Sequence, residues 1–398
     1  MTSSTKNLWI INQYAGSSKH GMTFRSFYLA KEFIKKYNVE IISASYSHVM
    51  NKPPEVHEKF TKEEVEGVSF NWVKVPRYKK SKSIGRILSM FLFLFELFLI
   101  NTKHLKKPDV IIVSSISPFP IWKAYLWAKR FNAKLIFEVR DIWPLSVIEL
   151  GGFSKYNPFV MLLQLTENFA YKYSDYVVSV LPLAFDHMKY HGLKKEKFIY
   201  IPNGVEIKES IGLTNTNSET FKVGYSGTLG IANALIYLVK AAELTQPLNI
   251  EFHILGDGPE KKNLQEIVLS KGLSNVIFHD AVPKEEVQAF LSKMDILYIG
   301  WHLSSLYRFG ISANKLFDYM MSAKPIVHSV SAGNDPVKEA KAGISIEPEN
   351  ATLIADAIIE IYNLSSEERT ILGKNGREYV EENHSYQQLA KQYESLFY

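Results

Sequence analysis

Short apolar runs alternate with longer amphipathic stretches along most of this chain. In the first half, the runs are four or five residues long and predict strands at 8–12, 39–43, 110–114, 134–138, 176–180 and 198–201. The stretch 23–37 between two of them has the periodicity of a helix. Strands separated by helices predict parallel βαβ units, and continuous apolar strands predict a sheet that is covered on both faces.

A second series of the same kind begins after residue 220. Its apolar runs predict strands at 221–225, 250–255, 276–279, 296–299 and 325–329, and a final helix at 386–397. The segment between the two series is rich in Ser, Thr and Asn and predicts a linker. We therefore expect an α/β protein with two doubly wound, Rossmann-like domains. The predicted parts are a domain at 1–205, a linker at 206–220, a domain at 221–385, and a helix at 386–398 that could pack back on the first domain.

Composition and charge fit two globular domains with different surfaces. The chain has 398 residues, of which 46% are hydrophobic and 22% are charged. Its net charge of +5 is uneven, because 29 basic and 16 acidic residues precede residue 206, whereas 17 and 25 follow. The absence of cysteine excludes a disulfide framework, a thiolate zinc site and a cysteine nucleophile. The amino terminus lacks the pattern of a secretory signal, so we expect a cytosolic protein.

The segment 84–100 is unusually apolar, with 13 apolar residues among 17. It is too short to span a membrane and contains Glu96. It could be a buried helix, or a helix lying in the membrane interface with basic flanks on anionic headgroups. We favour the second interpretation for 77–107 and expect a peripheral membrane protein at the inner face of the cell membrane. The residues expected at the membrane are Arg86, Phe91, Phe93, Phe95, Lys103, Lys106 and Lys107, preceded by the basic residues Arg77, Lys79, Lys80 and Lys82.

Two glycine motifs follow the first two strands of the second half. Ligands in doubly wound sheets bind beyond the carboxyl ends of the strands, so residues in these places are candidates for binding. The motifs are SGTLG at 226–230 and GDGP at 256–259. Glycines there let backbone amides approach a phosphate, although turn glycines are common between a strand and a helix. The candidate residues are Gly227, Thr228, Gly256, Asp257 and Gly258.

The segment 307–320 carries a more specific pattern, because a polar loop leads into a helix that starts near Asn314. Arg308 and Lys315 could neutralise a diphosphate, with Ser312 and Asn314 beside them. Asp318 lies three residues after Lys315, on the same helix face, and could accept hydrogen bonds from both hydroxyls of a ribose. The alternative is an ordinary helix end whose charges are solvated.

The first half has its own polar cluster, EVRDIWP, at the end of the strand 134–138. Asp141 could act as a base toward an acceptor hydroxyl or orient it, and Arg140 could bind a phosphate. Glu138 could fix Arg140, and Trp143 offers a flat face to a sugar. The alternative is a loop braced by an Arg–Asp pair.

The first glycine loop contributes two further candidates. Gly21 allows close approach of the backbone to a donor, and His20 could reach an acceptor or be merely solvated. The histidines are scattered and there is no D-x-D triplet, so we expect no metal site.

At these motifs the sequence resembles glycosyltransferase family 4, the retaining GT-B enzymes. The likeness extends over nearly the whole chain and includes SGTLG, GDGP and the block NKLFDYMMSAKPIV. The opening INQYAG, the HGM, Arg25 and YLAKE that follow it, and EVRDIWP are similar to bacterial capsule and O-antigen enzymes such as N-acetylfucosaminyltransferases. The resemblance implies a GT-B fold and a hexosyltransferase that moves a sugar from a UDP-sugar with retention, without a metal. The positive charge of the first half suits an anionic membrane and a diphosphate acceptor, so we expect the acceptor to be a sugar on a polyprenyl diphosphate, and we expect no nucleic-acid partner.

The sequence departs from the family at two places. Of the two glutamates that the family often has eight positions apart, the second corresponds to Asp318 and the first to Gly310. The basic residue that often follows the first glycine motif is missing, because Ile231, Ala232 and Asn233 stand there. We therefore expect the donor phosphates to depend on Arg308 and Lys315, and we predict Asp141, Arg140 and Lys315 as the catalytic residues.

Two alternatives of other classes remain at this point. A GT-B sugar-nucleotide epimerase would need no lipid acceptor and no interfacial helix, but it would need carboxylates near the sugar. A non-catalytic protein that binds membranes or nucleic acid is compatible with the lysines and phenylalanines at 77–107, but it would leave the donor motifs without a purpose.

Overall fold

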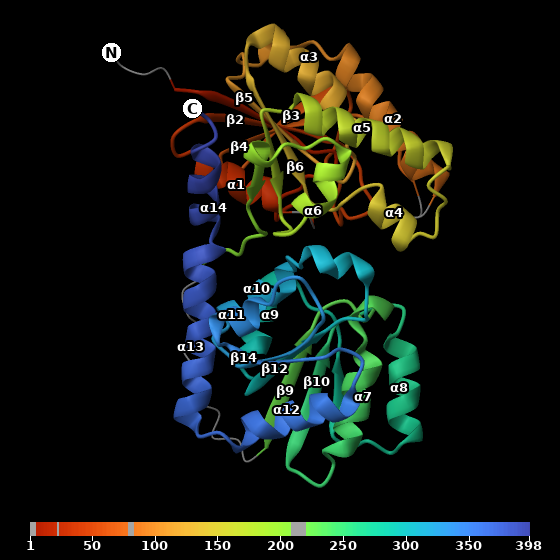
Figure 1. The fold of residues 1–398 in the computed structure, drawn as a ribbon, viewed down its shortest axis with the longest axis vertical. Helices are drawn as coiled ribbons and strands as arrows, with labels where there is room; N and C mark the ends of the chain where they lie inside the picture. Colours follow the sequence, from red (N-terminus) through yellow and green to blue (C-terminus); the bar gives the residue numbers. More distant parts are fainter. Residues whose placement is uncertain (1–4, 22–23, 79–82, 208–219) are drawn as a thin grey trace. The chain divides into compact units, whose positions relative to one another are not determined.

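Two separate sheets organise the chain. The computed structural model describes residues 5–21, 24–78, 83–207 and 220–398. The chain divides into two compact units, of which unit 1 comprises Met1–Asn203 with Tyr386–Tyr398 and unit 2 comprises Gly204–Ser385 (Figure 1). Most of the predicted linker 206–220 lies outside the described residues, as do Met22 of the HGM motif and Lys79, Lys80 and Lys82.

The sheet of unit 1 has eight strands in the order β3-β4-β2-β1-β5-β6-β7-β8. Its strands are β1 (Asn7–Ile11), β2 (Asn38–Ala44), β3 (Phe60–Val65), β4 (Val68–Val73), β5 (Val110–Ser114), β6 (Lys134–Val139), β7 (Tyr176–Ser179) and β8 (Phe198–Tyr200). All neighbours pair in parallel except β3 and β4. This hairpin was not predicted. Its two-residue turn has positive φ at both Glu66 and Gly67, of 50° and 77°, which is the backbone conformation that short hairpin turns favour.

Helices cover both faces of this sheet, as a doubly wound fold requires. They are α1 (Arg25–Phe33), α2 (Ile84–Leu99), α3 (Ile121–Phe131), α4 (Leu145–Glu149), α5 (Pro158–Tyr173), α6 (Phe185–Met188) and α14 (Tyr386–Glu394), with short 3-10 turns at Thr102–His104, Lys189–His191 and Lys195–Lys197. Along β1, alternate side chains point to opposite faces: Leu8 and Ile10 join the core with α1 and α14, whereas Trp9 meets Trp127 of α3 at 5.4 Å between ring centroids.

The last helix of the chain lies beside the first helix in unit 1, where α14 runs along α1 (Figure 1). Tyr386 packs against Tyr28 with ring centroids 5.0 Å apart, and Phe397 packs against Phe33 at 5.4 Å. The carboxylate of Glu394 lies 2.7 Å from the ammonium of Lys36. The last helix is therefore part of the core of unit 1 and not an appendage of unit 2.

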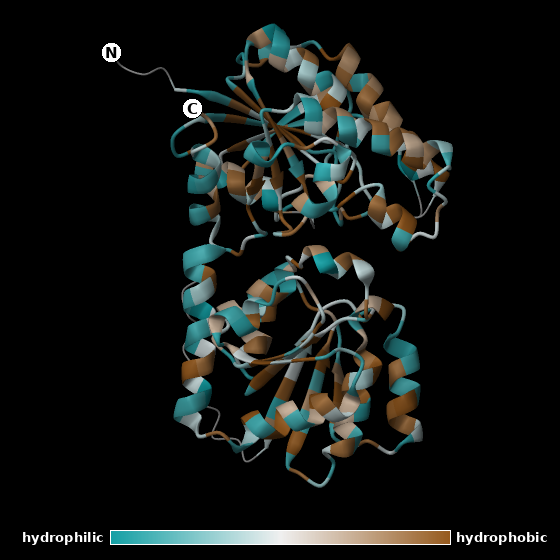
Figure 2. Cartoon of the chain, in the orientation of Figure 1, coloured by the Kyte–Doolittle hydropathy of each residue, from teal (hydrophilic) through white to brown (hydrophobic). Residues whose placement is uncertain are grey.

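Helix α2 holds the apolar segment, and the structure separates its residues into two faces. Phe93 is fully buried, so the expectation that its side chain enters a membrane is wrong, whereas Phe91 is half-buried and stacks on Phe119 at 4.9 Å. Phe95, by contrast, is 56% exposed. The hydropathy colouring shows how apolar this helix is (Figure 2). In the described parts of the chain, no helix is both long and apolar enough to cross a membrane.

The basic residues around α2 lie at different ends of unit 1. Arg86 donates to the hydroxyl of Tyr14 at 3.1 Å and its guanidinium lies 5.8 Å from the ring of Trp143, so this half-buried side chain lies near the EVRDIWP loop. Lys103, Lys106 and Lys107 are exposed beyond the other end of the helix. The carbonyl of Lys106 accepts from the indole of Trp9, which places it beside the start of β1.

The sheet of unit 2 has six parallel strands in the order β11-β10-β9-β12-β13-β14. The strands are β9 (Phe221–Ser226), β10 (Ile250–Leu255), β11 (Val276–His279), β12 (Ile296–Gly300), β13 (Ile326–Ser329) and β14 (Gly343–Ile346). The helices are α7 (Leu235–Leu244), α8 (Lys261–Ser270), α9 (Lys284–Leu291), α10 (Asn314–Met321), α11 (Pro336–Ala340), α12 (Ala351–Asn363) and α13 (Ser366–Asn383), with 3-10 turns at Ile231–Asn233 and Ser305–Phe309. The edge strand β14 was not predicted.

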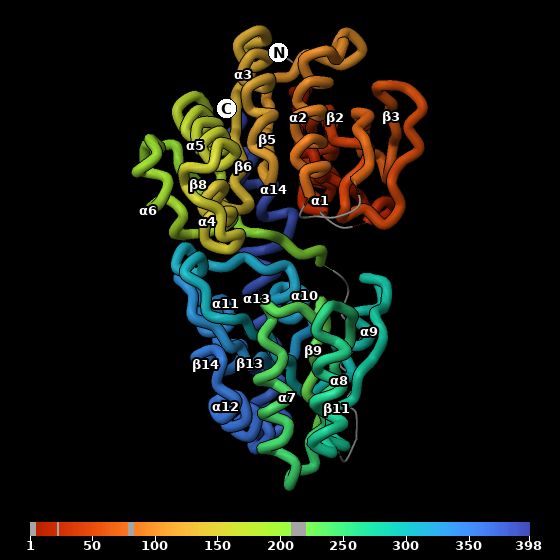
Figure 3. Tube along the Cα trace, turned by 90° about the vertical axis from the view of Figure 1, so that its right-hand side faces the viewer, coloured from red at the N-terminus to blue at the C-terminus, as the bar shows by residue number. Residues whose placement is uncertain are grey.

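Unit 2 also has an apolar core on each face of its sheet. On one face, α7 and α12 lie side by side (Figures 1 and 3), and both pack on residues of β9 and β10. On the other face, α9, α10 and α13 enclose a second cluster that includes Leu297, Phe317 and Val380. The predicted architecture of two doubly wound sheets is thus confirmed, and the carboxyl ends of the parallel strands identify where binding residues should gather.

Candidate active site

The two glycine motifs of unit 2 form one structure, because they pack backbone against backbone. The amide of Gly227 donates to the carbonyl of Leu255 at 3.0 Å, and the amide of Leu229 donates to the carbonyl of Asp257 at 2.8 Å. A Cβ atom on Gly256 would lie 1.9 Å from the carbonyl oxygen of Gly227. Gly256 and Gly258 are therefore needed to bring the loops together, whatever they contact beyond that. Thr228 and Asp257 are exposed on the same loops.

Lys315 reaches from α10 to the first glycine loop. Its ammonium donates to the hydroxyl of Tyr225 at 3.1 Å and to the side-chain carbonyl of Asn233 at 2.7 Å. The aliphatic stem packs on Gly227, where a Cβ would lie 3.0 Å from the Lys315 Cδ. Burial lowers the pKa of this ammonium to about 7, since its partners are neutral. The sequence predicted Lys315 but not Tyr225 or Asn233, which lie about ninety positions away.

The loop before α10 is fixed by a residue that the sequence did not single out. Asn334 donates to the carbonyl of Ile311 at 3.1 Å and accepts from its amide at 2.6 Å. Ser312 and Asn314 follow this anchored point, and Asn314 is the first residue of α10. Arg308 is exposed on the preceding turn, where its guanidinium lies over the ring of Phe309 at 4.3 Å. The structure thus brings Ser312, Asn314 and Lys315 together, with Arg308 at the rim of the same loop.

Asp318 lies one turn beyond Lys315 and is half-buried. Its carboxylate is 3.5 Å from the ammonium of Lys284, and its backbone carbonyl accepts from Gln288 at 2.9 Å. The next residue, Tyr319, holds the end of β9: its hydroxyl accepts from the amide of Ser226 at 2.6 Å and donates to the Ser226 carbonyl at 2.8 Å. Helix α10 is therefore locked to the glycine loop through two residues, Lys315 and Tyr319.

In unit 1, the structure pairs Glu138 with residues other than the predicted Arg140. Glu138 is 2% exposed and accepts from the Nε of Arg25 at 2.7 Å, from the Ser114 hydroxyl at 2.5 Å and from the Tyr393 hydroxyl at 2.5 Å. Burial would raise its pKa, but Arg25 and Arg140 outweigh this effect and lower the pKa to about 2. The predicted contact of Glu138 with an acceptor is not compatible with this burial.

Arg140 and Asp141 follow β6 at its carboxyl end. The amide of Arg140 donates to the Ser115 hydroxyl at 3.1 Å, whereas its Nε is buried and has no hydrogen-bond partner among the described residues. Asp141 accepts from the Ser146 hydroxyl through Oδ1. Trp143 is half-buried between the guanidinium of Arg86 and the apolar cluster around Phe119. These three residues lie on one short loop, as the sequence predicted.

His20 has a structural role that differs from the predicted one. It is 1% exposed, its Nδ1 lies 2.8 Å from the Ser17 hydroxyl, and its Nε2 lies 3.1 Å from a carboxylate oxygen of Glu63. Both ring nitrogens are therefore occupied, and acceptor binding by His20 is not supported. Gly21, with φ of 98°, packs on the backbone of Asn51, where a Cβ would lie 2.8 Å from the amide nitrogen.

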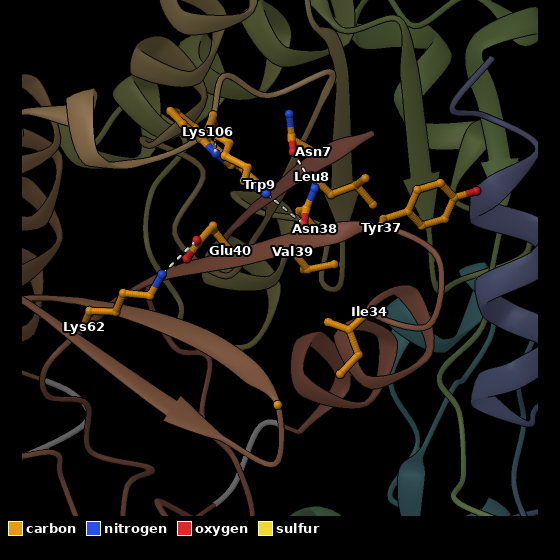
Figure 4. A pocket seen from close by; sticks show the side chains of 11 residues that line it. Asn7, Leu8, Trp9, Ile34, Tyr37, Asn38, Val39, Glu40, Lys62 and Lys106 are labelled. Carbon is orange, nitrogen blue, oxygen red and sulfur yellow. Dashed lines mark hydrogen bonds and ion pairs between the residues drawn. The ribbon is translucent and has the colours of Figure 1, made fainter. Parts of the chain in front are cut away.

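A hollow of about 390 Å³ lies at the opposite edge of the sheet of unit 1 (Figure 4). It is lined by the first residues of β1 and β2 and by Lys62 and Lys106. Its lysines are already engaged, Lys62 with Glu40 at 3.1 Å and Lys106 with Asn38 at 3.2 Å. Since ligands of such sheets bind at the carboxyl ends of strands, we do not assign this hollow to the site. Among the described residues, no cluster of three His, Asp or Glu side chains could hold a metal ion.

Comparison with known families agrees with this geometry. Residues 20–209 match the family model described as Glycosyltransferase Family 4, and residues 220–363 match the one described as Glycosyl transferases group 1. The two matches together extend over most of both units. The chain therefore belongs to the group 1/family 4 glycosyltransferases, and it is an enzyme that transfers a sugar from a nucleotide-sugar donor.

Individual relatives are distant. The probable glycosyltransferase WbjE of Pseudomonas aeruginosa is 20% identical over 77% of this chain and 80% of its own length. The putative colanic acid biosynthesis glycosyl transferase WcaI of Escherichia coli is 23% identical over 55% of this chain and 58% of its own length. Among solved structures, HepE of Anabaena in complex with UDP and glucose is similar with a TM-score of 0.66, 15% identity and 98% coverage of both chains. This structural likeness confirms the GT-B fold.

Proposed function

We propose that this glycosyltransferase transfers an N-acetylated amino sugar, of the FucNAc kind, from UDP to a sugar on a polyprenyl diphosphate. Transfer proceeds with retention, at the membrane, in the assembly of a bacterial capsule or O-antigen. The similarity to WcaI, which is named for colanic acid biosynthesis, supports a role in polysaccharide assembly. The complex of HepE with UDP supports a uridine nucleotide as the donor.

The observation that carries the donor assignment is the environment of Lys315. Its ammonium is held under the glycine loop by a hydroxyl and an amide, and no described carboxylate forms an ion pair with it. A desolvated cation without an anionic partner, next to backbone amides at the end of β9, is the arrangement that a diphosphate requires. The exposed Arg308 would add charge from the rim, and Asp318 would accept from the ribose hydroxyls.

The chemistry of transfer then follows from these groups. The bond between the anomeric carbon and the phosphate oxygen breaks, and a bond from the same face of the sugar to the acceptor oxygen forms. The proton of the acceptor hydroxyl moves to the departing phosphate oxygen. Lys315 and the loop amides stabilise the charge that develops on the diphosphate, which is the main contribution expected of the protein.

Unit 1 supplies the acceptor side. Asp141 uses Oδ1 for Ser146, and Oδ2 has no hydrogen-bond partner among the described residues, so it can orient the acceptor hydroxyl. Arg140 binds the acceptor diphosphate, and the half-buried Trp143 offers its edge to the sugar. The exposed apolar side of α2, with the cations at 103–107, docks the protein on the anionic membrane that carries the acceptor.

A transfer assay tests this function. Purified protein is incubated with membranes that contain the polyprenyl-linked acceptor and with a panel of radiolabelled UDP-sugars. We expect label from an N-acetylated amino sugar to enter the lipid fraction. We expect Asp141→Asn to lower that rate about tenfold or more, because the neutral amide is a weaker acceptor than the carboxylate for the hydroxyl that it orients. Isomerised UDP-sugar without labelled lipid would instead indicate an epimerase, and no conversion with any sugar would contradict the proposal.

A further inference from the structure

We propose that Arg25, Glu138 and Tyr393 form a positioning cluster that holds Arg140 ready for an anionic group of the acceptor. This inference rests on the proposed function only in taking that group to be the acceptor diphosphate. Arg25 stands in the opening part of the sequence that resembles the capsule and O-antigen enzymes, whereas Tyr393 belongs to no motif that the sequence singled out, and both are remote from the EVRDIWP loop along the chain.

The cluster is built around one carboxylate. Oε1 of Glu138 accepts from Arg25 and from Tyr393, and Oε2 accepts from Ser114. The side chains of Glu138 and its three donors are all buried. The carbonyl of Glu138 also accepts from the amide of Ser115 at 2.8 Å, and the hydroxyl of Ser115 accepts from the amide of Arg140. The position of Glu138 therefore fixes the backbone from which Arg140 projects.

The charges of the cluster do not cancel. Glu138 contributes one negative charge, and the two guanidiniums of Arg25 and Arg140 act on it together. Of these two guanidiniums, that of Arg25 forms a hydrogen bond with the carboxylate, whereas the Arg140 Nε stays buried without a partner among the described residues. Burying an unpaired polar group is unfavourable unless a ligand satisfies it. The excess positive charge and the unsatisfied donor both indicate an anion.

The same cluster holds both segments through which unit 1 continues into unit 2. The guanidinium of Arg25 donates to the carbonyl of Ile201 at 3.1 Å and to that of Pro202, just before the chain leaves the unit. Tyr393 lies in α14, after the chain has returned. The returning helix therefore contributes a side chain to the support of the acceptor loop, which gives the carboxyl-terminal residues a part in acceptor binding.

The test measures anion binding separately from catalysis. Inorganic pyrophosphate is titrated into the full-length protein by calorimetry, with the donor site saturated by UDP. We expect wild-type protein to bind it, Arg140→Met to lose binding, and Tyr393→Phe to bind about tenfold more weakly, since a hydrogen bond to a charged group is lost. The affinity for UDP should be the same in all of them, and in the transfer assay the acceptor KM of Tyr393→Phe should rise while its donor KM stays constant.

The matched control is Tyr171→Phe, which removes another buried hydroxyl of unit 1, one that interacts with Glu167 of α5 and not with Glu138. It should leave pyrophosphate binding unchanged. Should Tyr393→Phe fail to fold, Ser114→Ala removes a different donor to Glu138 and should weaken binding in the same direction. Equal pyrophosphate affinity of wild type and the folded variant, or unchanged binding in Arg140→Met, would overturn the inference even if the enzyme transfers sugar. Absence of transfer with pyrophosphate binding as expected would instead contradict the proposed function alone.

Discussion

At the scale of single residues, three buried ionisable groups show that the charge of the neighbouring groups decides in which direction burial finally shifts the pKa. Burial raises the pKa of Glu167 in α5 to about 8, because the polar groups around it do not offset the loss of hydration. Burial acts on Glu138 in the same direction, but the guanidiniums of Arg25 and Arg140 bring its pKa down to about 2. Lys315 has only neutral partners, so its pKa falls to about 7. Glu138 thus has partners of opposite charge within the protein, whereas Lys315 lacks an anionic partner among the described residues.

This environment predicts that donor binding takes up a proton. As pH rises through about 7, Lys315 of the free protein loses its proton, whereas a bound diphosphate favours the ammonium. The affinity for UDP-N-acetylglucosamine, whose diphosphate does not titrate in this range, should therefore fall between pH 6 and pH 8.5, by close to tenfold per pH unit at the upper end. Calorimetry in buffers of different ionisation enthalpy measures both the affinity and the proton uptake.

Two variants make this prediction specific. Lys315→Met should bind the nucleotide weakly and without pH dependence, whereas Lys240→Met, at an exposed position of α7, should behave like the wild type. If the wild-type affinity did not change over this pH range, the assignment of the diphosphate to Lys315 would be wrong.

At the scale of elements, α2 shows how one apolar helix serves two environments. Its buried face consists of Ser89, Met90, Phe93, Leu94 and Leu97. Its exposed face has large side chains at helical spacing, at Ile84, Leu88, Phe95, Phe98 and Leu99. A helix that is apolar all round either is fully buried or meets a second apolar phase. Helix α2 is not fully buried, because one of its faces is exposed. Contact of that face with a membrane would give it a second apolar phase, and this supports membrane docking.

Substitutions on the two faces should therefore have different effects. Replacing Ile84, Leu88, Phe95 and Leu99 together with Ser should release the protein from vesicles containing phosphatidylglycerol while the free energy of unfolding changes little, as is usual for surface positions. Phe93→Ala should leave a cavity and cost about 3–5 kcal/mol. Vesicle sedimentation and thermal unfolding measure the two effects, with Leu269→Ser in α8, also highly exposed, as the control. Sedimentation of the fourfold variant at the wild-type level would refute the docking surface.

At the scale of the whole molecule, the two units have separate hydrophobic cores. The clusters of unit 1 involve its sheet with α1, α14, α2, α3 and α5, and those of unit 2 involve its own sheet and helices. Five of the six tryptophans, at positions 9, 72, 122, 127 and 143, belong to unit 1, and Trp301 belongs to unit 2. Tryptophan fluorescence therefore reports mainly on unit 1, which allows the units to be followed separately.

We accordingly expect two unfolding transitions. UDP should raise the calorimetric transition of unit 2, because a ligand that binds only the native state stabilises it, and should leave the midpoint measured by tryptophan fluorescence nearly unchanged. Phe93→Ala should lower the fluorescence midpoint only. A single transition that both changes shift equally would show that the units unfold as one cooperative body.

The sequence alone determined the class of fold and most of the candidate loops. Apolar runs at the spacing of βαβ units predicted eleven of the strands, and they missed the β3–β4 hairpin and the edge strand β14 of the described residues. SGTLG, GDGP, the segment 307–320 and EVRDIWP were recognisable because each is a local motif directly after a strand, and strand ends gather at one edge of a parallel sheet.

Only the tertiary structure decided what these residues contact. Glu138 meets Arg25 and Tyr393 across 113 and 255 positions of sequence, and Lys315 meets Tyr225 and Asn233 across 90 and 82. His20 proved to be buried, and one face of α2 proved to be core. A local pattern sets the type of an element and the end of the strand on which a residue stands. The partner of a buried charge depends on which distant elements pack against it, and that information is absent from any single stretch of sequence.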